Sequence, residues 1–463
     1  MSDAPAAKRR QGILRVAMVA GTAEDVTAWG GLALVLETMR ALRLEDAALK
    51  HLPVGRRQRG FAPEEKLEAL VLLLAAGGDR VEDIRRLAED KGLERMLGAP
   101  FPSPDALLDF LGQFHDEALV AARPEGKKAY VPEESEGLKG LAAINRALVA
   151  HGASAEATTA TIDADGTIIE AHKREATIAY EGTRGYQPLV AVWAEEALVV
   201  ADEFRDGNVA GGEDPLSCAK RAFECLPQQV NRRYYRADSA SYYVPLLKHL
   251  VDGGIGFSIS ADMTKELRVA CQALPERKWT ALEERTTEVL HVTDVAFAPG
   301  RWPKKAEPLR YVALRFSPRQ GSFFEERGPK WLAIVSNRWE PSATELVRWH
   351  WGKAGTIEHV HRVMKDELGA GTLPSGRFGV NAAWFRINAI VFNILTVLKR
   401  RALPESLRTA RPRRLRFECF TAPAKLTVHQ SQLVATMGVS KERLELLVDA
   451  RGRLLKMRED AEP

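Results

Sequence analysis

Apolar residues in the first 150 positions recur with the period of a helix. Between Glu64 and Ala76 they fall on one helical face, at Leu67, Leu70, Val71 and Leu74. The same period continues from Val81 to Leu97. Ser103-Pro104-Asp105 supplies an N-cap, a proline in the first turn and a first-turn acid, so a helix is predicted to begin there. These signals predict an all-helical N-terminal domain over residues 1–150.

After residue 158 the pattern changes to short strands and then to alternating helices and strands. Three strand-like runs come first, at Thr158–Ile169, Leu189–Trp193 and Leu198–Phe204. A helix, a strand, a helix and a strand follow, at Pro215–Cys225, Arg233–Asp238, Tyr242–Val251 and Ile255–Ser260. Because parallel strands need crossover connections, this βββαβαβ order predicts an α/β fold of the ribonuclease-H-like type. Residues 151–261 are predicted to form the first part of that core.

The rest of the chain divides into three predicted segments. Residues 262–340 are a β-rich insertion, with strand-like runs at Thr287–Phe297, Tyr311–Phe316 and Trp331–Ser336. Residues 341–403 hold two strong helical patterns, Thr356–Leu368 and Asn381–Arg401, and are predicted to complete the core against the sheet. Residues 404–463 form a basic C-terminal region that ends in a short helix.

Composition adds a local rather than a global charge signal. The 463 residues are 45% hydrophobic, which excludes a disordered chain, and 66 Lys and Arg against 62 Asp and Glu leave a net charge of only +4. Residues 399–416 are different, because they contain eight basic side chains and the single acid Glu405. We interpret this segment, including Arg411, Arg413 and Arg414, as phosphate-binding rather than as a solvated linker. Arg56, Arg57 and Arg59 are further candidates for phosphate contacts, although a purely structural helical region explains them equally well.

Cysteine usage and hydropathy bear on the compartment. The four cysteines lie far apart without a Cys-x-x-Cys pair, which argues against a zinc site and against a disulfide scaffold. The longest apolar run, Ala69–Ala76, is far shorter than the roughly 20 residues that cross a bilayer. A cytoplasmic protein without a membrane partner is predicted.

Acidic side chains are placed where strands of the predicted sheet end. Asp163 and Asp165 lie two apart in the first strand and therefore on one face of it, and Asp238 ends the fourth strand, its expected neighbour. Glu358 begins a helix, and Lys365 lies two turns later on the same face. Two Asp and one Glu can hold two divalent ions about 4 Å apart for in-line attack on a phosphodiester. The strand period does not separate Asp163 from Asp165. His359 and His361 are two apart on the helix and face different ways, so we expect them to face solvent or phosphate rather than a metal.

Several segments together resemble a known family. They are Ile162-Asp163-Ala164-Asp165-Gly166-Thr167, Gly185-Tyr186-Gln187-Pro188-Leu189, Arg205-Asp206-Gly207-Asn208, Arg236-Ala237-Asp238-Ser239 and Gly355-Thr356-Ile357-Glu358. In these segments the chain resembles bacterial insertion-sequence DDE transposases of the IS4-type group, with a β-rich insertion before the catalytic Glu (IS1380-like). The resemblance implies Asp165, Asp238 and Glu358 as catalytic, metal-binding residues, with Asp163 kept as the alternative first Asp.

The signature of this family, Y-x2-R-x3-E-x6-K, is matched in part. Glu358 and Lys365 are in place, whereas Trp351 stands where Tyr is expected and Ala354 where Arg is expected. Trp351 retains a stacking surface, and Lys353 offers a cation in shifted geometry. By resemblance, Trp351, Lys353 and Lys365 are DNA-binding candidates.

The sequence therefore predicts a DNA transposase of the bacterial cytoplasm. It would bind terminal inverted repeats and cleave and join double-stranded DNA, both transposon ends and target, with two Mg²⁺ ions or Mn²⁺ in their place. Synapsis of two ends implies a homodimer. Two alternatives remain: a metal-dependent DNA nuclease without strand transfer, and a non-catalytic DNA-binding protein derived from a transposase.

Overall fold

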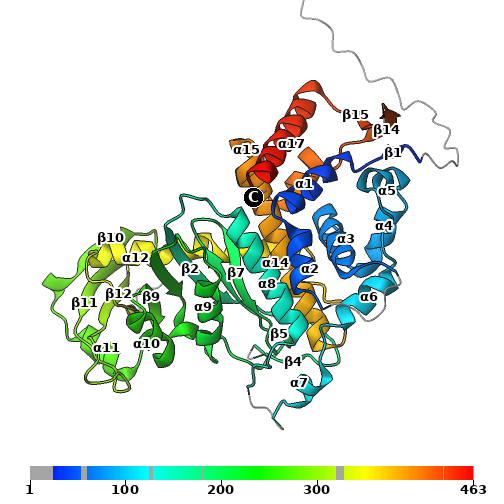
Figure 1. The fold of residues 1–463 in the computed structure, drawn as a ribbon. Helices are drawn as coiled ribbons and strands as arrows, with labels where there is room; N and C mark the ends of the chain where they lie inside the picture. The colour runs from blue at the N-terminus through cyan, green and yellow to red at the C-terminus, as the bar shows by residue number, and fades with distance from the viewer. Residues whose placement is uncertain are drawn as a thin grey trace, which may run out of the picture.

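The structure, a computed structural model, describes residues 24–53, 60–124, 129–179, 181–319, 328–430 and 432–461. Arg56, Arg57 and Arg59 lie outside the described residues. A large mixed sheet fills one half of the molecule, and the N-terminal helices fill the other (Figure 1). The long helix α14 (Phe378–Val397) runs between the two halves.

The sheet has nine strands in the order β10-β11-β12-β13-β9-β8-β2-β6-β7. The part of the sheet that comes first in the sequence is an antiparallel meander of β2 (Thr159–Gly166), β6 (Leu189–Trp193) and β7 (Leu198–Glu203). Two strands, β8 (Arg232–Ala237) and β9 (Gly256–Ala261), then add in parallel beside β2. With helices α9 (Pro215–Glu224) and α10 (Val244–Asp252) between them, the order of these elements is the predicted βββαβαβ.

Three short strands that the sequence did not predict interrupt this order between β2 and β6. They are β3 (Ile169–Glu170), β4 (Thr177–Ile178) and β5 (Arg184–Tyr186), and they form a small sheet of their own. Gly185 lies against the backbone of Ile169, where a Cβ would come within 2.1 Å of the Ile169 oxygen. Glycine therefore allows the close pairing of β3 with β5.

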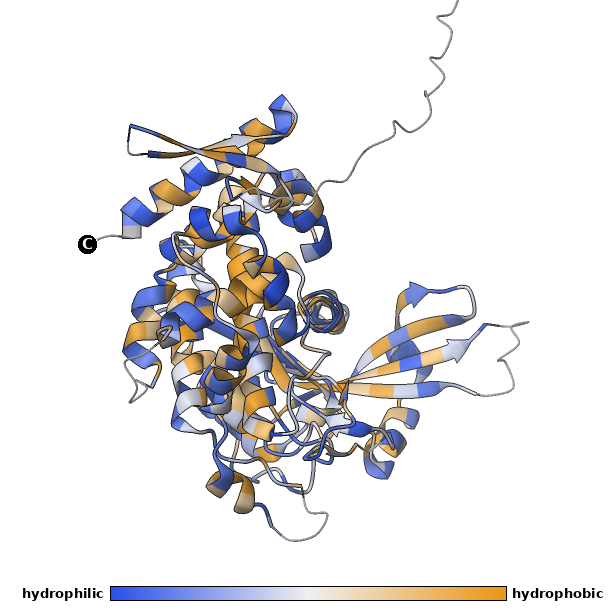
Figure 2. Ribbon diagram, turned by 90° about the vertical axis from the view of Figure 1, so that its right-hand side faces the viewer, coloured by the Kyte–Doolittle hydropathy of each residue, from blue (hydrophilic) through white to orange (hydrophobic). Residues whose placement is uncertain are grey.

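The β-rich segment extends the main sheet. After α11 (Lys265–Gln272), the strands β10 (Thr280–Glu284), β11 (Glu288–Val295), β12 (Arg310–Pro318) and β13 (Lys330–Ser336) follow one another as antiparallel neighbours. Strand β13 pairs with β9, with Ile334 opposite Ser260. In Figure 2 these strands form an arm that projects from the body of the molecule.

Two groups of helices cover the opposite faces of the sheet. Helix α9 contacts β2, β6 and β7, and the ring of Phe223 meets Tyr235 of β8. The other face carries α12 (Ala343–Trp351), the 3-10 turn η6 (Gly352–Gly355) and α13 (Ile357–Glu367). Side chains alternate along a strand, so Arg236, the neighbour of Tyr235, points to this second face and donates to the Trp349 carbonyl.

The described part of residues 24–150 is helical apart from one short strand. Its helices are α1 (Ala33–Ala41), α2 (Leu44–His51), α3 (Pro63–Ala76), α4 (Ile84–Ala88), α5 (Lys91–Leu97), α6 (Pro104–Gly112), α7 (Glu117–Ala121) and α8 (Glu136–Gly152). The predicted start at Ser103 is confirmed, because its side chain accepts a hydrogen bond from the Ala106 amide at 3.2 Å. Helices α3, α6 and α8 pack on α14, so this region shares its core with the rest of the chain.

Helix α14 carries buried polar side chains that join three elements. Arg386 pairs with Asp202 of β7 at 2.9 Å and with Glu134, just before α8, at 2.8 Å. The Asn393 amide donates to the Val199 carbonyl, and its oxygen accepts from the Val199 amide. Within the described residues, the stretch Phe378–Ala402 is long and apolar enough to cross a membrane, yet its apolar window is wholly buried inside the fold, as in a core helix.

A segment near the start of the described residues meets one near their end in a second small sheet. Strand β1 (Val26–Thr27) pairs with β14 (Ala424–His429), and β14 pairs with β15 (Gln432–Met437). The last helix, α17 (Lys441–Ala461), packs on α1 (Figure 1). Gly31 lies so close to the Cys419 carbonyl that a Cβ would come within 1.9 Å of its oxygen. Between α14 and β14 the chain forms a short π-helix (η7, Leu398–Ala402), α15 (Glu405–Arg408), α16 (Pro412–Leu415) and a second short π-helix (η8, Arg416–Phe420).

Candidate active site

The candidate carboxylates lie on the face of the sheet that α12 and α13 cover. In the parallel register of β2 and β8, Asp163 stands beside Arg236. Asp165 and Asp238 each lie two residues further along their strands, and the period of two keeps them on the same face. The site thus has an inner pair, Asp163 and Arg236, and an outer pair, Asp165 and Asp238.

The inner pair is a buried ion pair. Asp163 is fully buried, and its oxygens accept from Nε and Nη2 of Arg236 at 2.6 and 2.8 Å. The Thr356 hydroxyl, just before α13, also donates to Asp163, and Nη1 of Arg236 donates to the Trp349 carbonyl at 2.6 Å. Asp163 and Arg236 therefore fasten α12 and α13 to the sheet, and both oxygens of Asp163 are engaged inside the protein.

The outer pair is more accessible and is bridged by a cation. Nζ of Lys353 lies 3.1 Å from Oδ2 of Asp165, whose side chain is 23% exposed. Asp238 caps the 3-10 turn that follows β8, because its Oδ1 accepts from the Ala240 amide at 3.1 Å. Burial raises the pKa of Asp238, and the nearby charge of Asp165 raises it further, while Lys353 opposes both effects. Two carboxylates from neighbouring parallel strands thus interact electrostatically around one ammonium group.

Glu358 lies in the first turn of α13 with an exposed side chain. Lys365, two turns later, donates from Nζ to the Ile168 carbonyl at 2.8 Å and to the Thr167 hydroxyl at 3.4 Å, just beyond the end of β2. Since residues i and i+7 share a helical face, the face that carries Glu358 is the face that α13 turns toward the end of β2.

His361 lies between Glu358 and Lys365 on this face, and the expectation that it faces solvent is wrong, because its side chain is buried. The side chain is 9% exposed, and both ring nitrogens lack a hydrogen-bond partner among the described residues. Burial lowers the pKa of His361 to about 4. The charge of Asp165 raises this pKa, whereas the charges of Lys365 and Lys353 lower it further. The i, i+3 spacing from Glu358 was the signal that the sequence offered.

The segment before α13 connects the site to the arm. Trp351 is half-buried and packs beside the apolar cluster of α12 with β11 and β12, and the Arg285 guanidinium lies 5.8 Å from its ring centre. Lys353, which the sequence predicts to contact DNA, follows in η6. In this structure its ammonium group pairs with Asp165. Arg236 and Thr356 were missed from the sequence, although the period of two from Asp238 places Arg236 opposite Asp163.

The basic segment at residues 399–416 is largely engaged within the protein. Lys399 is buried, which lowers its pKa to about 8, and Arg400 donates to Glu196 at 2.5 Å. Arg416 donates to the carbonyls of Leu74 and Ala75 at the end of α3. Of the three predicted phosphate contacts, Arg411 pairs with Glu367, whereas Arg413 and Arg414 are exposed at α16. The outward positive charge is therefore smaller than the sequence count.

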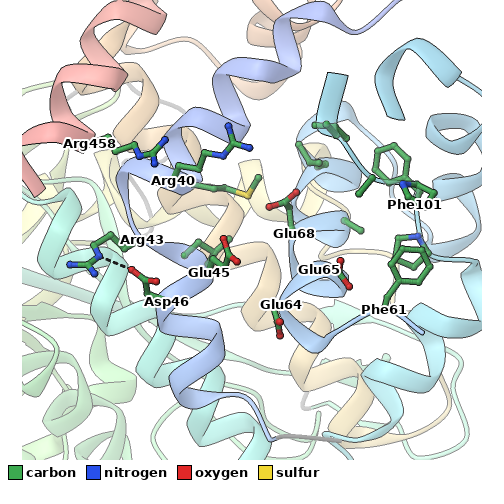
Figure 3. Close-up of a pocket in the computed structure, with 18 residues that line it drawn as sticks. Arg40, Arg43, Glu45, Asp46, Phe61, Glu64, Glu65, Glu68, Phe101 and Arg458 are labelled. Atoms are coloured by element: carbon green, nitrogen blue, oxygen red, sulfur yellow. Dashed lines mark hydrogen bonds and ion pairs between the residues drawn. The ribbon is translucent and has the colours of Figure 1, made fainter. Parts of the chain in front are cut away.

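A separate pocket of about 450 Å³ lies among the N-terminal helices (Figure 3). Its charged lining consists of five acids and three arginines: Glu45, Asp46, Glu64, Glu65 and Glu68 with Arg40, Arg43 and Arg458. Arg43 is paired with Asp46 at 2.7 Å, and burial raises the pKa of Glu68. None of the sequence-predicted site residues lines this pocket, and its acidic excess disfavours a phosphate ligand.

The donor set around Asp165 suits a divalent cation in its chemistry. It combines the carboxylates of Asp165 and Asp238 with the two unpartnered ring nitrogens of His361, while the exposed Glu358 lies one turn before His361 on α13. In the described residues, however, no three His, Cys, Asp or Glu side chains converge closely enough to hold an ion as they stand. The Lys353 ammonium satisfies Asp165 in this arrangement, so a cation would have to replace it.

Comparison with known proteins bears on the family. A family model described as transposase DDE domain group 1 matches residues 14–459. Among solved structures, the chain is similar to the piggyBac transposase in a cryo-EM structure of its synaptic complex with hairpin DNA. The two share 13% identity and a TM-score of 0.41, over 93% of this chain and 80% of that chain. No curated protein matches the chain. Because the family model spans nearly the whole sequence, the chain belongs to the transposase family with a DDE domain of group 1.

Proposed function

We propose that the chain is a DNA transposase whose catalytic residues are Asp165, Asp238 and Glu358. The observation that carries the proposal is the outer carboxylate pair, in which the charge of Asp165 raises the pKa of Asp238 across neighbouring parallel strands. Such coupling is typical of carboxylates that share a cation. Membership of the DDE family supports the same conclusion.

Asp165 rather than Asp163 is proposed as the first carboxylate. Asp163 is fully buried, and Arg236 and Thr356 engage both of its oxygens. A metal ligand at that position would leave the guanidinium of Arg236 buried without its counter-charge, which is costly. Asp165 keeps an exposed edge, and its partner is a lysine, whose flexible stem lets it move away.

Asp165, Asp238 and Glu358 would hold two divalent ions, Mg²⁺ or Mn²⁺. When bound, these ions would activate a water or a 3′-hydroxyl and would neutralise charge on the phosphodiester. The chain's own residues prepare the site: Arg236 and Asp163 fasten the covering helices, and Lys365 holds α13 against the end of β2. The core that carries them is proposed to be ribonuclease-H-like, with support from the order β7-β6-β2-β8-β9 and its helical connections.

DNA would approach the face that carries α13 and α16. Arg413 and Arg414 are exposed there, and Glu367 of α13 bonds with the backbone of Arg413. Lys353, once displaced from Asp165, would add a further cation next to the reacting phosphate. Lys365, Arg411 and Trp351 are proposed as additional contacts.

The proposed partners are double-stranded transposon ends and target DNA. The proposed synaptic form is a homodimer, and the proposed location is the bacterial cytoplasm. The predicted domain limits at residues 150, 261, 340 and 403 stay part of this proposal.

A non-catalytic DNA-binding protein derived from a transposase is the second candidate. Two observations favour it: Trp351 and Ala354 depart from the family signature, and Lys353 takes the position of a cation at Asp165. A nuclease without strand transfer shares the first chemical step, so product analysis separates it from the transposase.

The test is a cleavage and joining assay on labelled DNA that carries the inverted repeats flanking the coding region. The native protein is compared with Asp165→Asn, Asp238→Asn and Glu358→Gln, in Mg²⁺ or in EDTA. Asp366→Asn is the matched control, because Asp366 is an exposed carboxylate on the same helix. We expect metal-dependent cutting at the repeat ends and joined products that the three variants lose and the control keeps. Specific binding without any cutting would overturn the catalytic proposal.

A further inference from the structure

His361 combines burial with unsatisfied polar atoms. Its side chain is 9% exposed, and neither ring nitrogen has a hydrogen-bond partner in the described part of the chain. Leaving a buried polar atom unpaired is unfavourable, so such groups are rare and need an explanation. An absent partner that binds at the ring, such as a cation, would supply one.

The surroundings of His361 identify the position of that partner. The ring lies near the carboxylate and backbone of Asp165 from β2, the ammonium of Lys353 from η6 and that of Lys365 from its own helix. Lys365 is engaged with the Ile168 carbonyl, and Lys353 is engaged with Asp165.

Two other histidines show that burial alone does not leave a ring unpartnered. His350 of α12 is 6% exposed, yet its ring nitrogens lie 2.9 Å from the Ser258 hydroxyl and 3.1 Å from the Ser260 hydroxyl. His359, two residues before His361, is half-buried among Lys399, Arg362 and Arg411, and the carboxylate near it is Glu367 rather than Asp165. His361 is therefore distinct in facing a carboxylate of the candidate site without a bond of its own.

We propose that His361 is a nitrogen ligand to the divalent cation held by Asp165, with Glu358 one turn earlier on the same helix. This inference rests on the proposed function, and it adds a residue that determines metal specificity. Imidazole binds first-row transition ions well, whereas Mg²⁺ prefers oxygen donors. The site is thus expected to bind Mn²⁺ more tightly than Mg²⁺.

Pulsed electron paramagnetic resonance of bound Mn²⁺ tests the inference without relying on activity. The full-length protein is loaded with Mn²⁺ in the absence of DNA, and the spectrum is searched for coupling to ¹⁴N. We expect the native protein to show this coupling and His361→Gln to lose it. The His361→Gln change is also expected to weaken Mn²⁺ binding about tenfold or more, since even ligand-supporting residues cost 10–100-fold. His359→Gln is the matched control and should behave as the native protein.

The outcomes separate this inference from the proposed function. If Asp165→Asn releases Mn²⁺ but the native protein shows no nitrogen coupling, the role of His361 is overturned and the carboxylate site stands. Nitrogen coupling that persists in His361→Gln would also overturn it. Mn²⁺ binding that neither Asp165→Asn nor Asp238→Asn alters would contradict both proposals. Circular dichroism and thermal unfolding of each variant check that the fold is retained.

Discussion

Two aspartates separated by one residue have opposite environments in this protein. Asp163 is an internal counter-ion to Arg236, whereas Asp165 lies at the rim with the mobile partner Lys353. The strand period placed both on one face but could not rank them, because a period of two is blind to depth along the strand; the family resemblance alone favoured Asp165. The register between β2 and β8 supplies that depth, and it depends on a pairing between segments 73 residues apart.

The two aspartates should respond differently to substitution. Asp163→Ala removes the counter-charge of a buried guanidinium and is expected to lower the free energy of unfolding by about 3–5 kcal/mol. Asp165→Ala breaks a pair whose side chains keep 23% and 13% exposure and also removes a negative charge near Asp238, so it should cost less stability than Asp163→Ala, while it abolishes DNA cleavage. Urea unfolding of both variants, followed by circular dichroism, measures the difference. Equal stability losses would contradict the assignment of depth.

Lys353 is expected to compete with the metal. Its ammonium holds Asp165 and opposes the raised pKa of Asp238, so Lys353→Met removes a competing cation. Isothermal titration should then show Mn²⁺ binding several-fold tighter than in the native protein. Lys365→Met is the comparison, because Lys365 bonds to backbone and hydroxyl oxygens rather than to the carboxylates. Weaker Mn²⁺ binding in Lys353→Met would show that Lys353 supports the site instead.

His350 should give the protein a pH-dependent stability. Burial, with help from Lys353, lowers its pKa from 6.5 to about 4, so the unfolded chain binds a proton in a range where the folded chain does not. Titration of His350 therefore leaves the free energy of unfolding at its full value above pH 6.5. As the pH falls toward 4, protonation of the unfolded chain lowers that free energy by up to about 3 kcal/mol. Urea unfolding at a series of pH values should show this loss, and His350→Asn should flatten the curve over the same range. Parallel curves for the two proteins would rule out His350 as the cause.

At the scale of elements, the local signals were sufficient where the pattern was regular. The predicted helices at 356–368 and 381–401 correspond to α13 and α14, and the predicted strands at 311–316 and 331–336 lie within β12 and β13. The small sheet β1-β14-β15 was missed, although Ala424, Leu426 and Val428 alternate with polar residues along β14; β15 gave no such signal, because its side chains are mostly exposed. Continuation of the main sheet through β13 was also missed, since a strand's neighbours are set by tertiary contacts rather than by its own residues.

Helix α14 is expected to depend on the charges within it. Arg386 is buried and bonds with Glu134 and Asp202, and although burial opposes ionisation, Arg386 lowers the pKa of Glu134 to about 2. Arg386→Met leaves both carboxylates without their cation and should lower the free energy of unfolding by about 3–5 kcal/mol. Differential scanning calorimetry measures the loss. Adding Glu134→Gln and Asp202→Asn to Arg386→Met should recover part of it, and a triple variant no more stable than the single one would contradict this account.

At the scale of the whole molecule, the first and last segments form one structure. The Gly30 amide donates to the Ala422 carbonyl at 2.9 Å, β1 pairs with β14, and Arg451 of α17 lies 3.4 Å from Glu37 of α1. Packing of α3 and α8 on α14 brings residues from both sides of position 150, where the sequence predicts a domain limit, into one hydrophobic cluster. The helical pattern could not reveal this, because an amphipathic face does not specify its partner.

Removal of α17 should therefore destabilise the N-terminal helices. A chain ending at residue 439 exposes the face of α1 that α17 covers. We expect hydrogen exchange of α1 and α2 to accelerate by at least tenfold, while β2 and β8 at the candidate site remain protected. Replacing the exposed Glu459 with Gln in the full chain serves as a control that keeps the helix. Unchanged protection of α1 in the shortened chain would show that the N-terminal helices are stable by themselves.

The joining of the two ends also sets the order of events during synthesis. Domains fold N-terminal first as a chain leaves the ribosome at about 5–20 residues per second. Here β1 and α1 are translated well before their partners β14 and α17. About 400 residues separate Val26 from Lys425, its partner in the sheet, so the earliest segment waits tens of seconds with its apolar face uncovered. Nascent chains of this protein are thus expected to need chaperone protection of β1 and α1 until β14 and α17 have been translated.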